Sequence, residues 1–154
     1  MSTHLISWLQ RQWPTPSPVN PIERLRASAG ALIGILLTGL VSAWALGPGA
    51  GALWLAAPMG ASAVLLFAVP SSPLAQPWSM VGGNLMGALV GVTCARFIEA
   101  PVLAAALAIA LAIAAMFALR CIHPPSGAVA LTAVLGGAPV HQAGYGFVDR
   151  KSVV

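Results

Sequence analysis

The chain has 154 residues, of which 58% are hydrophobic and only 6% are charged, and its net charge is +4. No Asp, Glu, Lys or Arg occurs between Ala27 and Ala95, or between Cys121 and Val148. Charged side chains are costly at the centre of a bilayer, whereas a water-soluble surface needs many of them. The composition therefore excludes a soluble globular protein and predicts a single all-α membrane domain with several spans.

The basic residues are scattered near the ends of apolar segments, which is typical of charges that orient a membrane protein and not of a nucleic-acid-binding patch. They are Arg11, Arg24, Arg26, Arg96, Arg120, Arg150 and Lys151. A cytoplasmic N-terminus places four of the first five on the inner side and only Arg96 outside. The positive-inside rule favours this orientation, and we expect a bacterial inner (plasma) membrane.

Residues 1–23 predict a leader that lies in the cytoplasm or at the membrane interface, because Trp8 and Trp13 favour the headgroup region and no signal peptide is recognisable. Asn20 is a suitable helix cap, with Pro21 at the first helical position. The predicted membrane domain then covers residues 24–147, and a short tail covers residues 148–154.

Four apolar segments are long enough to cross a hydrocarbon core of about 30 Å. They are Ala27–Leu46, Gly51–Val69, Ser79–Ala95 and Pro101–Leu119. Pro58 falls near the middle of the second segment, where proline is expected to kink or break the helix. Glycines four residues apart, such as Gly30 with Gly34 and Gly87 with Gly91, predict close helix packing.

The stretch Arg120–Ala128 concentrates polar and helix-breaking residues between two apolar segments. Pro124 disfavours helix at His123, so the fourth span should end there, and Pro125 suits the start of a new helix. This helix should run to Leu135 and stop at two glycines. Its length of roughly 15 Å is half a bilayer, which predicts a broken or re-entrant helix.

The pattern P-x-G-A-x-A occurs at both Pro58–Val64 and Pro125–Leu131. A chain this rich in alanine and glycine can produce such a match by chance. A true repeat would give two opposed broken helices whose N-termini meet at a shared site, an arrangement that transporters use to bind anions.

Two stretches of the sequence, Arg120–Gly137 and Ala57–Asn84, resemble the HPP family of integral membrane proteins, and the similarity spans roughly residues 24–147. The resemblance implies a small helical membrane domain. Plastid and cyanobacterial relatives are associated with nitrite transport, so it implies nitrite as a candidate substrate. It also implies a further apolar helix after Phe147, where this sequence has a short polar tail.

These features predict a transporter or channel for a small anion, with hydrogen-bond donors along its pathway. The residues expected to bind the substrate are His123, Ser126, Gly127, Ser62, Gly60, Asn84 and Thr132, and the helix breaks are expected at Pro58, Pro124 and Pro125. Helix N-termini near the two glycines would supply backbone N–H groups. His123 would add a titratable charge that couples anion movement to a proton.

Other functions fit the sequence less well. Ser126 and His123 lack an acidic partner and a G-x-S-x-G turn, so we expect no enzyme activity. The histidines His4, His123 and His141 have no common metal-ligand spacing, and we expect neither metal nor cofactor. The expected partners are the lipid bilayer and further copies of the chain. The alternative function is a non-transporting scaffold or partner subunit, or a truncated, inactive family member.

Overall fold

A computed structural model describes residues 19–46 and 50–148, and within them the chain is helical without any strand. The elements are α2 (Pro21–Leu46), α3 (Ala50–Ala68), the short 3₁₀ helix η1 (Pro73–Ala75), α4 (Pro77–Phe97), α5 (Pro101–Ala118), α6 (Pro125–Leu135) and α7 (Gly137–Ala143). The predicted all-α class is confirmed. Most of the predicted leader and tail lies outside the described residues, as does the turn at residues 47–49.

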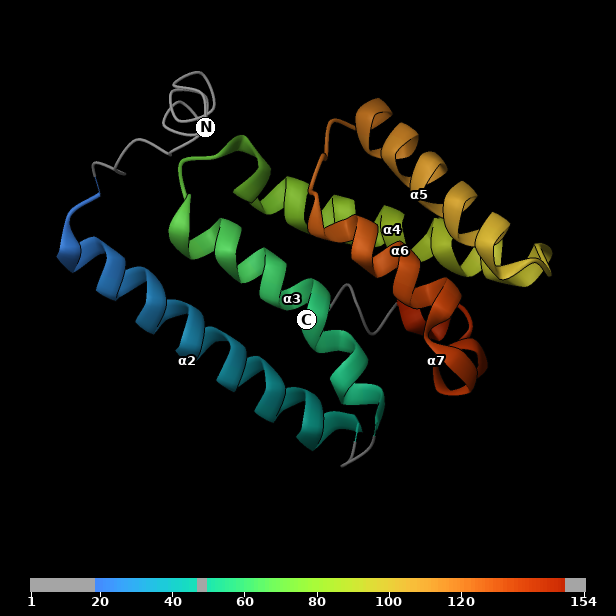
Figure 1. Cartoon of the computed structure of the whole chain (residues 1–154), viewed down its shortest axis with the longest axis horizontal. Helices are drawn as coiled ribbons and strands as arrows, with labels where there is room; N and C mark the ends of the chain where they lie inside the picture. Colours follow the sequence, from blue (N-terminus) through green and yellow to red (C-terminus); the bar gives the residue numbers. More distant parts are fainter. Residues whose placement is uncertain (1–18, 47–49, 149–154) are drawn as a thin grey trace, which may run out of the picture.

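Three helices of the described chain are long and apolar enough to cross a membrane: residues Pro21–Trp44 of α2, and all of α4 and α5. The 19-residue α3 contains no charged residue and runs antiparallel to α2 (Figure 1). The 11-residue α6 follows the His-Pro-Pro stretch and is only about 16 Å long at 1.5 Å per residue. These elements fit the predicted architecture of about four spans and one half-length helix.

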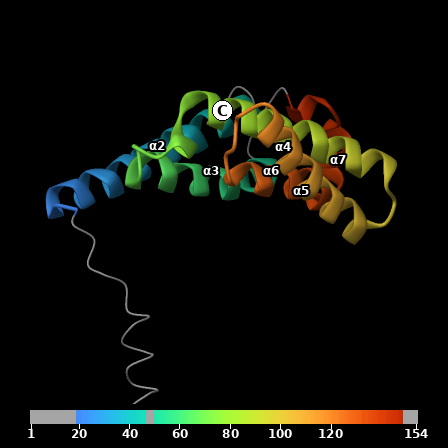
Figure 2. The same ribbon diagram turned by 90° about the horizontal axis from the view of Figure 1, so that it is seen from above.

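The helices lie side by side in a shallow layer, with α2 at one edge and α5 and α7 at the other (Figure 2). Helix α6 is central, because it contacts α3, α4, α5 and α7. Successive helices from α2 to α6 alternate in direction (Figure 1). Arg24, Arg26 and Arg120 therefore lie at one end of the layer and Arg96 lies at the other.

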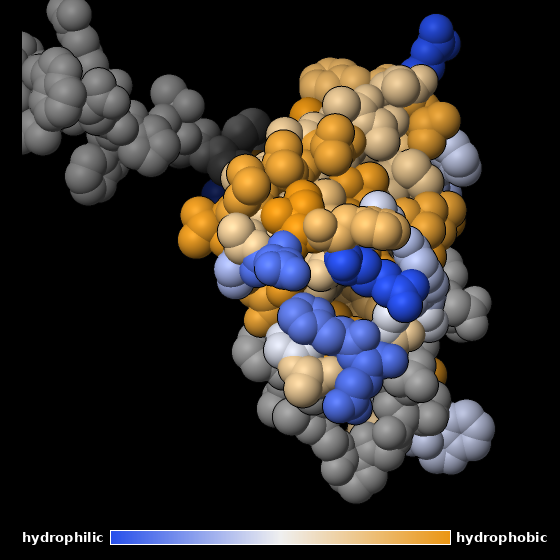
Figure 3. Space-filling model, turned by 90° about the vertical axis from the view of Figure 1, so that its right-hand side faces the viewer, coloured by the Kyte–Doolittle hydropathy of each residue, from blue (hydrophilic) through white to orange (hydrophobic). Residues whose placement is uncertain are grey.

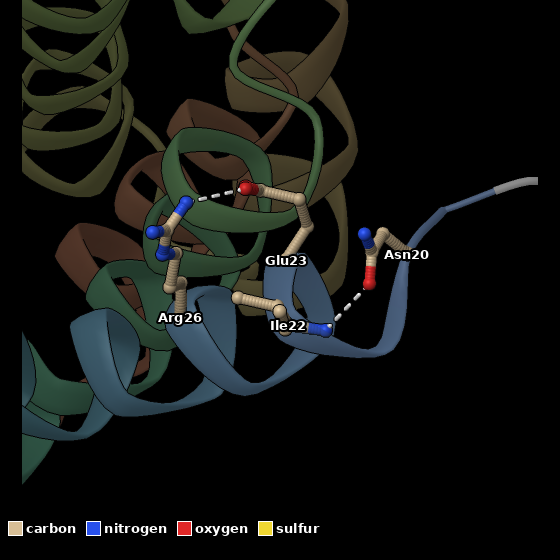
Figure 4. Close-up of polar contacts among 4 residues, drawn as sticks. All are labelled: Asn20, Ile22, Glu23 and Arg26. Atoms are coloured by element: carbon tan, nitrogen blue, oxygen red, sulfur yellow. Dashed lines mark hydrogen bonds and ion pairs between the residues drawn. The ribbon is translucent and has the colours of Figure 1, made fainter.

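The first turn of α2 is capped as the sequence predicts. The amide N–H of Ile22 donates to Asn20 Oδ1 at 3.0 Å, and Pro21 occupies the first helical position (Figure 4). Arg26 forms an ion pair with Glu23 at 2.7 Å one turn further on. The cap starts α2 six residues before the predicted start of the span at Ala27.

Helix α3 passes through Pro58 without a break, so the predicted helix break at Pro58 is wrong. Proline removes one backbone donor, a loss that helices in membranes tolerate when neighbouring groups compensate. Here the proline is fully buried among neighbouring side chains, which hold the helix together around it. The Pro58 carbonyl accepts from Ser62 Oγ at 3.1 Å, although this bond does not replace the missing donor.

Glycines produce the closest helix contacts, as the four-residue spacing predicts. A Cβ on Gly91 of α4 would lie 2.7 Å from both the carbonyl oxygen and the Cβ of neighbouring alanines on α6, Ala130 and Ala133 respectively. On α2, Gly30 and Gly34 instead accommodate the ring of Phe67 from α3. Helix α5 contributes a buried stripe four residues apart: Ala104, Ala108, Ala112 and Met116.

Candidate functional site

The connection between α5 and α6 begins with a tight helix end. Helix α5 stops at Ala118, one residue before the predicted Leu119. The N–H of Cys121 then donates to Met116 O at 2.9 Å, and Arg120 adopts the left-handed backbone conformation with φ 54°. This hydrogen-bond pattern is the Schellman motif, in which glycine usually occupies the left-handed position. The motif reverses the chain so that residues 121–124 run back over α4.

Replacing Arg120 with glycine is expected to raise the free energy of unfolding by about 0.5–1 kcal/mol, because glycine adopts the left-handed conformation without strain. Arg120→Ala removes the same side chain but keeps the Cβ, so it should bring no such gain. Thermal unfolding of both variants in detergent measures the difference. Equal stabilities would show that the backbone at this position is not strained.

His123 is completely buried and is hydrogen-bonded through both ring nitrogens. Its Nδ1 lies 2.9 Å from the carbonyl oxygen of Leu74 in η1, and its Nε2 lies 2.9 Å from Ser62 Oγ on α3. A carbonyl oxygen can only accept, so Nδ1 carries the hydrogen and the Nε2 of a neutral ring accepts from Ser62. The imidazole thereby joins three separate parts of the fold: the α5–α6 connection, η1 and α3.

The Ser62–His123 pair has the distance of a hydroxyl and its general base, but its surroundings suit a structural role better. The second ring nitrogen faces a backbone carbonyl, whereas hydrolase triads use a carboxylate at this position. The single Ser62 hydroxyl hydrogen is also shared with a second acceptor, the Pro58 carbonyl of its own helix. The serine considered from the sequence, Ser126, faces Asn84 and is not hydrogen-bonded to the His123 ring.

Ser126 is the second residue of α6 and is likewise fully buried. Its hydroxyl donates to Asn84 Oδ1 on α4 at 3.1 Å. This contact requires α4 and α6 to lie very close, and Gly83 makes that possible. A Cβ on Gly83 would lie 2.7 Å from both His123 Cβ and Ser126 Oγ. Gly82 and Gly83, in the second turn of α4, therefore form the surface on which the His-Pro-Pro connection packs.

A cavity of about 180 Å³ lies beside this network, between α2, α3, α4 and α6. It is lined mainly by apolar side chains, and its polar lining residues are Thr38, Ser62 and Asn84. Since one buried water needs roughly 10–15 Å³ by this measure, the cavity has room for several waters or a small ion. No charged residue is among its described lining residues.

Two groups at this cavity have hydrogen-bonding capacity to spare. The Asn84 side chain uses its oxygen to accept from Ser126, and among the described residues its amide nitrogen has no acceptor. The Thr38 hydroxyl likewise makes no hydrogen bond within the described part of the chain. The cavity therefore offers donors without a fixed negative charge, which suits a small anion.

The structure brings together four of the predicted substrate-binding residues and separates the other three. Two hydrogen-bonded pairs form: Ser62 with His123, and Ser126 with Asn84. One member of each pair, Ser62 or Asn84, also lines the cavity. Thr132 lies two turns along α6, where its hydroxyl donates to Ala128 O at 2.7 Å.

The two predicted glycine sites do not supply helix N-terminal donors to this cavity. Gly60 lies inside the continuous helix α3, not at a helix N-terminus. The N–H of Gly127 donates to Pro124 O at 3.1 Å, and its Cα faces Ile109 of α5. Of the three predicted helix breaks, the breaks at Pro124 and Pro125 are correct, since α6 begins at Pro125 with Pro124 as its cap residue.

Sequence reasoning missed two parts of the site. The Leu74 carbonyl is a backbone acceptor, and no residue type marks such a group in advance. Thr38 lies in the middle of an apolar span that also contains Ser28 and Ser42, so its hydroxyl did not stand out in the sequence. Outside the site, the indole N–H of Trp78 donates to Leu119 O at 3.1 Å, which holds the end of α5 against the start of α4.

Comparison with known proteins identifies the family of the chain. The model of the family "HPP, transmembrane region" matches residues 16–151, which is nearly the whole chain. The chain belongs to the HPP family. The His-Pro-Pro triplet of this HPP domain is His123-Pro124-Pro125, the connection whose histidine is buried between α3 and η1.

Two transmembrane proteins of Dictyostelium discoideum are similar to this HPP domain. One is 42% identical over 84 residues, which are 49% of this chain and 28% of the relative. The other is 40% identical over 87 residues, which are 54% of this chain and 28% of the relative. The match thus spans little more than a quarter of either relative. No solved structure matches the chain.

Proposed function

We propose that this HPP domain carries a small inorganic anion across the membrane, and that the anion binds in the cavity beside Asn84. The observation that carries the proposal is the unused amide nitrogen of Asn84, which lines a cavity without charged residues. An anion in such a place gains hydrogen bonds but is not held by a strong counter-ion, so it can leave again. Nitrite is the first candidate, because the family resemblance implies it.

The same proposal assigns His123 a different role from the one expected from the sequence. His123 is fully buried and does not line the cavity, so it does not touch the anion in this arrangement. It holds Ser62 and η1 in place instead. We propose further that the N-terminus is cytoplasmic in a bacterial plasma membrane, and that copies of the chain associate, since the described residues supply few spans to enclose a pathway.

Asn84→Asp is the sharpest test, because the carboxylate still accepts a hydrogen bond from Ser126 but no longer offers donors to an anion. Uptake of nitrite and nitrate into proteoliposomes should fall at least roughly tenfold, the equivalent of losing about 1.4 kcal/mol of binding. Gel filtration and thermal unfolding establish that the variant is folded.

Thr132→Val is the matched control. It removes a hydroxyl that the sequence placed on the pathway but that the structure places on α6, bonded to its own helix. Uptake should therefore stay at the level of the unmodified protein. Loss of uptake in Thr132→Val but not in Asn84→Asp would reject the cavity as the anion site. Background uptake by the unmodified protein would favour the alternative, a non-transporting scaffold or partner subunit.

A further inference from the structure

A second cavity, of about 110 Å³, lies at the opposite end of the layer between α4, α6 and α7. Arg96 in the last turn of α4 and His141 of α7 line it, together with apolar side chains such as Val92 and Val140. Polar side chains gather on this end of the molecule among apolar ones (Figure 3). This cavity is separate from the one beside Asn84, since the two share no described lining residue.

The exposed Arg96 guanidinium lies against an aromatic ring and not against a carboxylate. Its central carbon lies 5.2 Å from the centroid of the Tyr145 ring, within the range of a cation–π contact. Tyr145 is oriented in turn by a 3.3 Å contact between its hydroxyl and Thr93 Oγ1. A ring contact occupies one face of the guanidinium but leaves its N–H donors available.

His141 is fixed beside Arg96 by the fold of α7. Its Nε2 lies 2.8 Å from the Val134 carbonyl, so this nitrogen carries a hydrogen and donates it. The left-handed glycines Gly137 and Gly144 bound α7 and fold it back against the end of α4. The imidazole is therefore a preformed wall of the cavity.

No acidic side chain balances this positive charge within the described part of the chain. The ion pair found there joins Glu23 and Arg26, at the other end of the layer. Glu99 follows Arg96 in the α4–α5 connection, but it is exposed and does not line the cavity. A cationic group that lines a small cavity, without a paired carboxylate, suits an oxyanion, which a guanidinium binds through two parallel hydrogen bonds.

We propose that the cavity at Arg96 is a second anion site, which binds a small oxyanion through the guanidinium, with His141 beside it. The oxygens of a free inorganic anion and those of a phospholipid headgroup present the same chemistry to Arg96. The site is independent of the Asn84 cavity, and it would concentrate anions at the opposite membrane surface whether or not the inner cavity conducts them.

Chemical modification of the unmodified protein tests the proposal without any risk of misfolding. Phenylglyoxal reacts with accessible guanidinium groups, and mass spectrometry gives the rate at each arginine. Nitrate in lipid-free detergent should slow modification of Arg96 several-fold relative to gluconate at equal ionic strength. Arg120, exposed at the other end, is the internal control and should react equally in both salts.

A second arm identifies the source of the anion. Protection of Arg96 by nitrate in lipid-free detergent indicates a free anion, whereas protection only in nanodiscs that contain phosphatidylglycerol indicates a lipid headgroup. Equal reactivity of Arg96 in nitrate, in gluconate, and in nanodiscs with and without phosphatidylglycerol would overturn the proposal. Equal protection of Arg96 and Arg120 would overturn it as well, because it would show a general salt effect.

Two variants test whether protection of Arg96 by nitrate depends on the Tyr145 ring, and whether it is independent of uptake through the Asn84 cavity. Tyr145→Leu removes the ring that holds the guanidinium, so protection of Arg96 by nitrate should decrease several-fold. Asn84→Asp changes only the distant cavity, and protection should be unchanged even if uptake is lost. If Tyr145→Leu retains full protection, the ring does not position Arg96 for an anion and the proposed geometry is wrong.

Discussion

Replacing His123 with alanine is expected to lower the free energy of unfolding by about 2–4 kcal/mol, because the ring is fully buried and hydrogen-bonded through both nitrogens. The substitution leaves the Leu74 carbonyl without its donor and leaves an empty space where the ring was. Ser62 loses one partner but keeps the Pro58 carbonyl, so the cost comes mainly from Leu74 and from the cavity. Thermal or denaturant unfolding in detergent measures it.

His141→Ala is the matched control for this experiment. His141 also donates to a backbone carbonyl, Val134 O at 2.8 Å, but its side chain is exposed and water can replace it. Its loss should cost at most about 1 kcal/mol. His123→Asn, which can restore a donor for the Leu74 carbonyl, should recover part of the lost stability. If His123→Ala is as stable as His141→Ala, the buried histidine is not the structural link described above.

Gly87→Ala is expected to destabilise the protein by about 1–3 kcal/mol, because the added methyl group would overlap with the Ser126 carbonyl oxygen of α6. Alanine favours helix over glycine by up to about 1 kcal/mol, so the contact must cost more than this gain. The added Cβ meets backbone, and backbone cannot rotate away as a flexible side chain does. Helices α4 and α6 would have to move apart, and this movement would weaken the hydrogen bond between Ser126 and Asn84.

Gly39→Ala in α2 isolates the helix-propensity effect, because a Cβ at Gly39 meets no atom within 4 Å. This control should be neutral or more stable, and thermal unfolding of the two variants side by side compares them directly. A Gly87→Ala protein as stable as Gly39→Ala would mean that α4 and α6 are further apart than the structure places them.

Local sequence signals predicted the helix ends well. Asn20 and Pro21 mark the start of α2, and Pro125 and Gly136 mark the start and the cap of α6, as expected. These predictions succeed because capping and proline geometry depend on neighbouring residues alone. The prediction of a helix break at Pro58 is wrong. Whether a proline breaks a helix depends on the surrounding helices, whose positions the sequence does not reveal.

The candidate site could be predicted only in part. The sequence identified the polar residues, but not which of them face one another, because that depends on how each helix is rotated against its neighbours. Gly127 and Thr132 lie on the same short helix as Ser126, yet Gly127 packs towards α5 and Thr132 does not line the cavity. The Leu74 carbonyl carries no sequence signal at all, and α7 was not expected.

The most direct test of the anion site is an experimental structure of the protein crystallised in bromide, with anomalous diffraction to locate the ions. We expect a bromide in the cavity between α2, α3, α4 and α6, within hydrogen-bonding distance of the Asn84 amide nitrogen. The peak should be missing in Asn84→Asp. A cavity filled by a lipid or detergent chain, with no bromide near Asn84, would contradict the account.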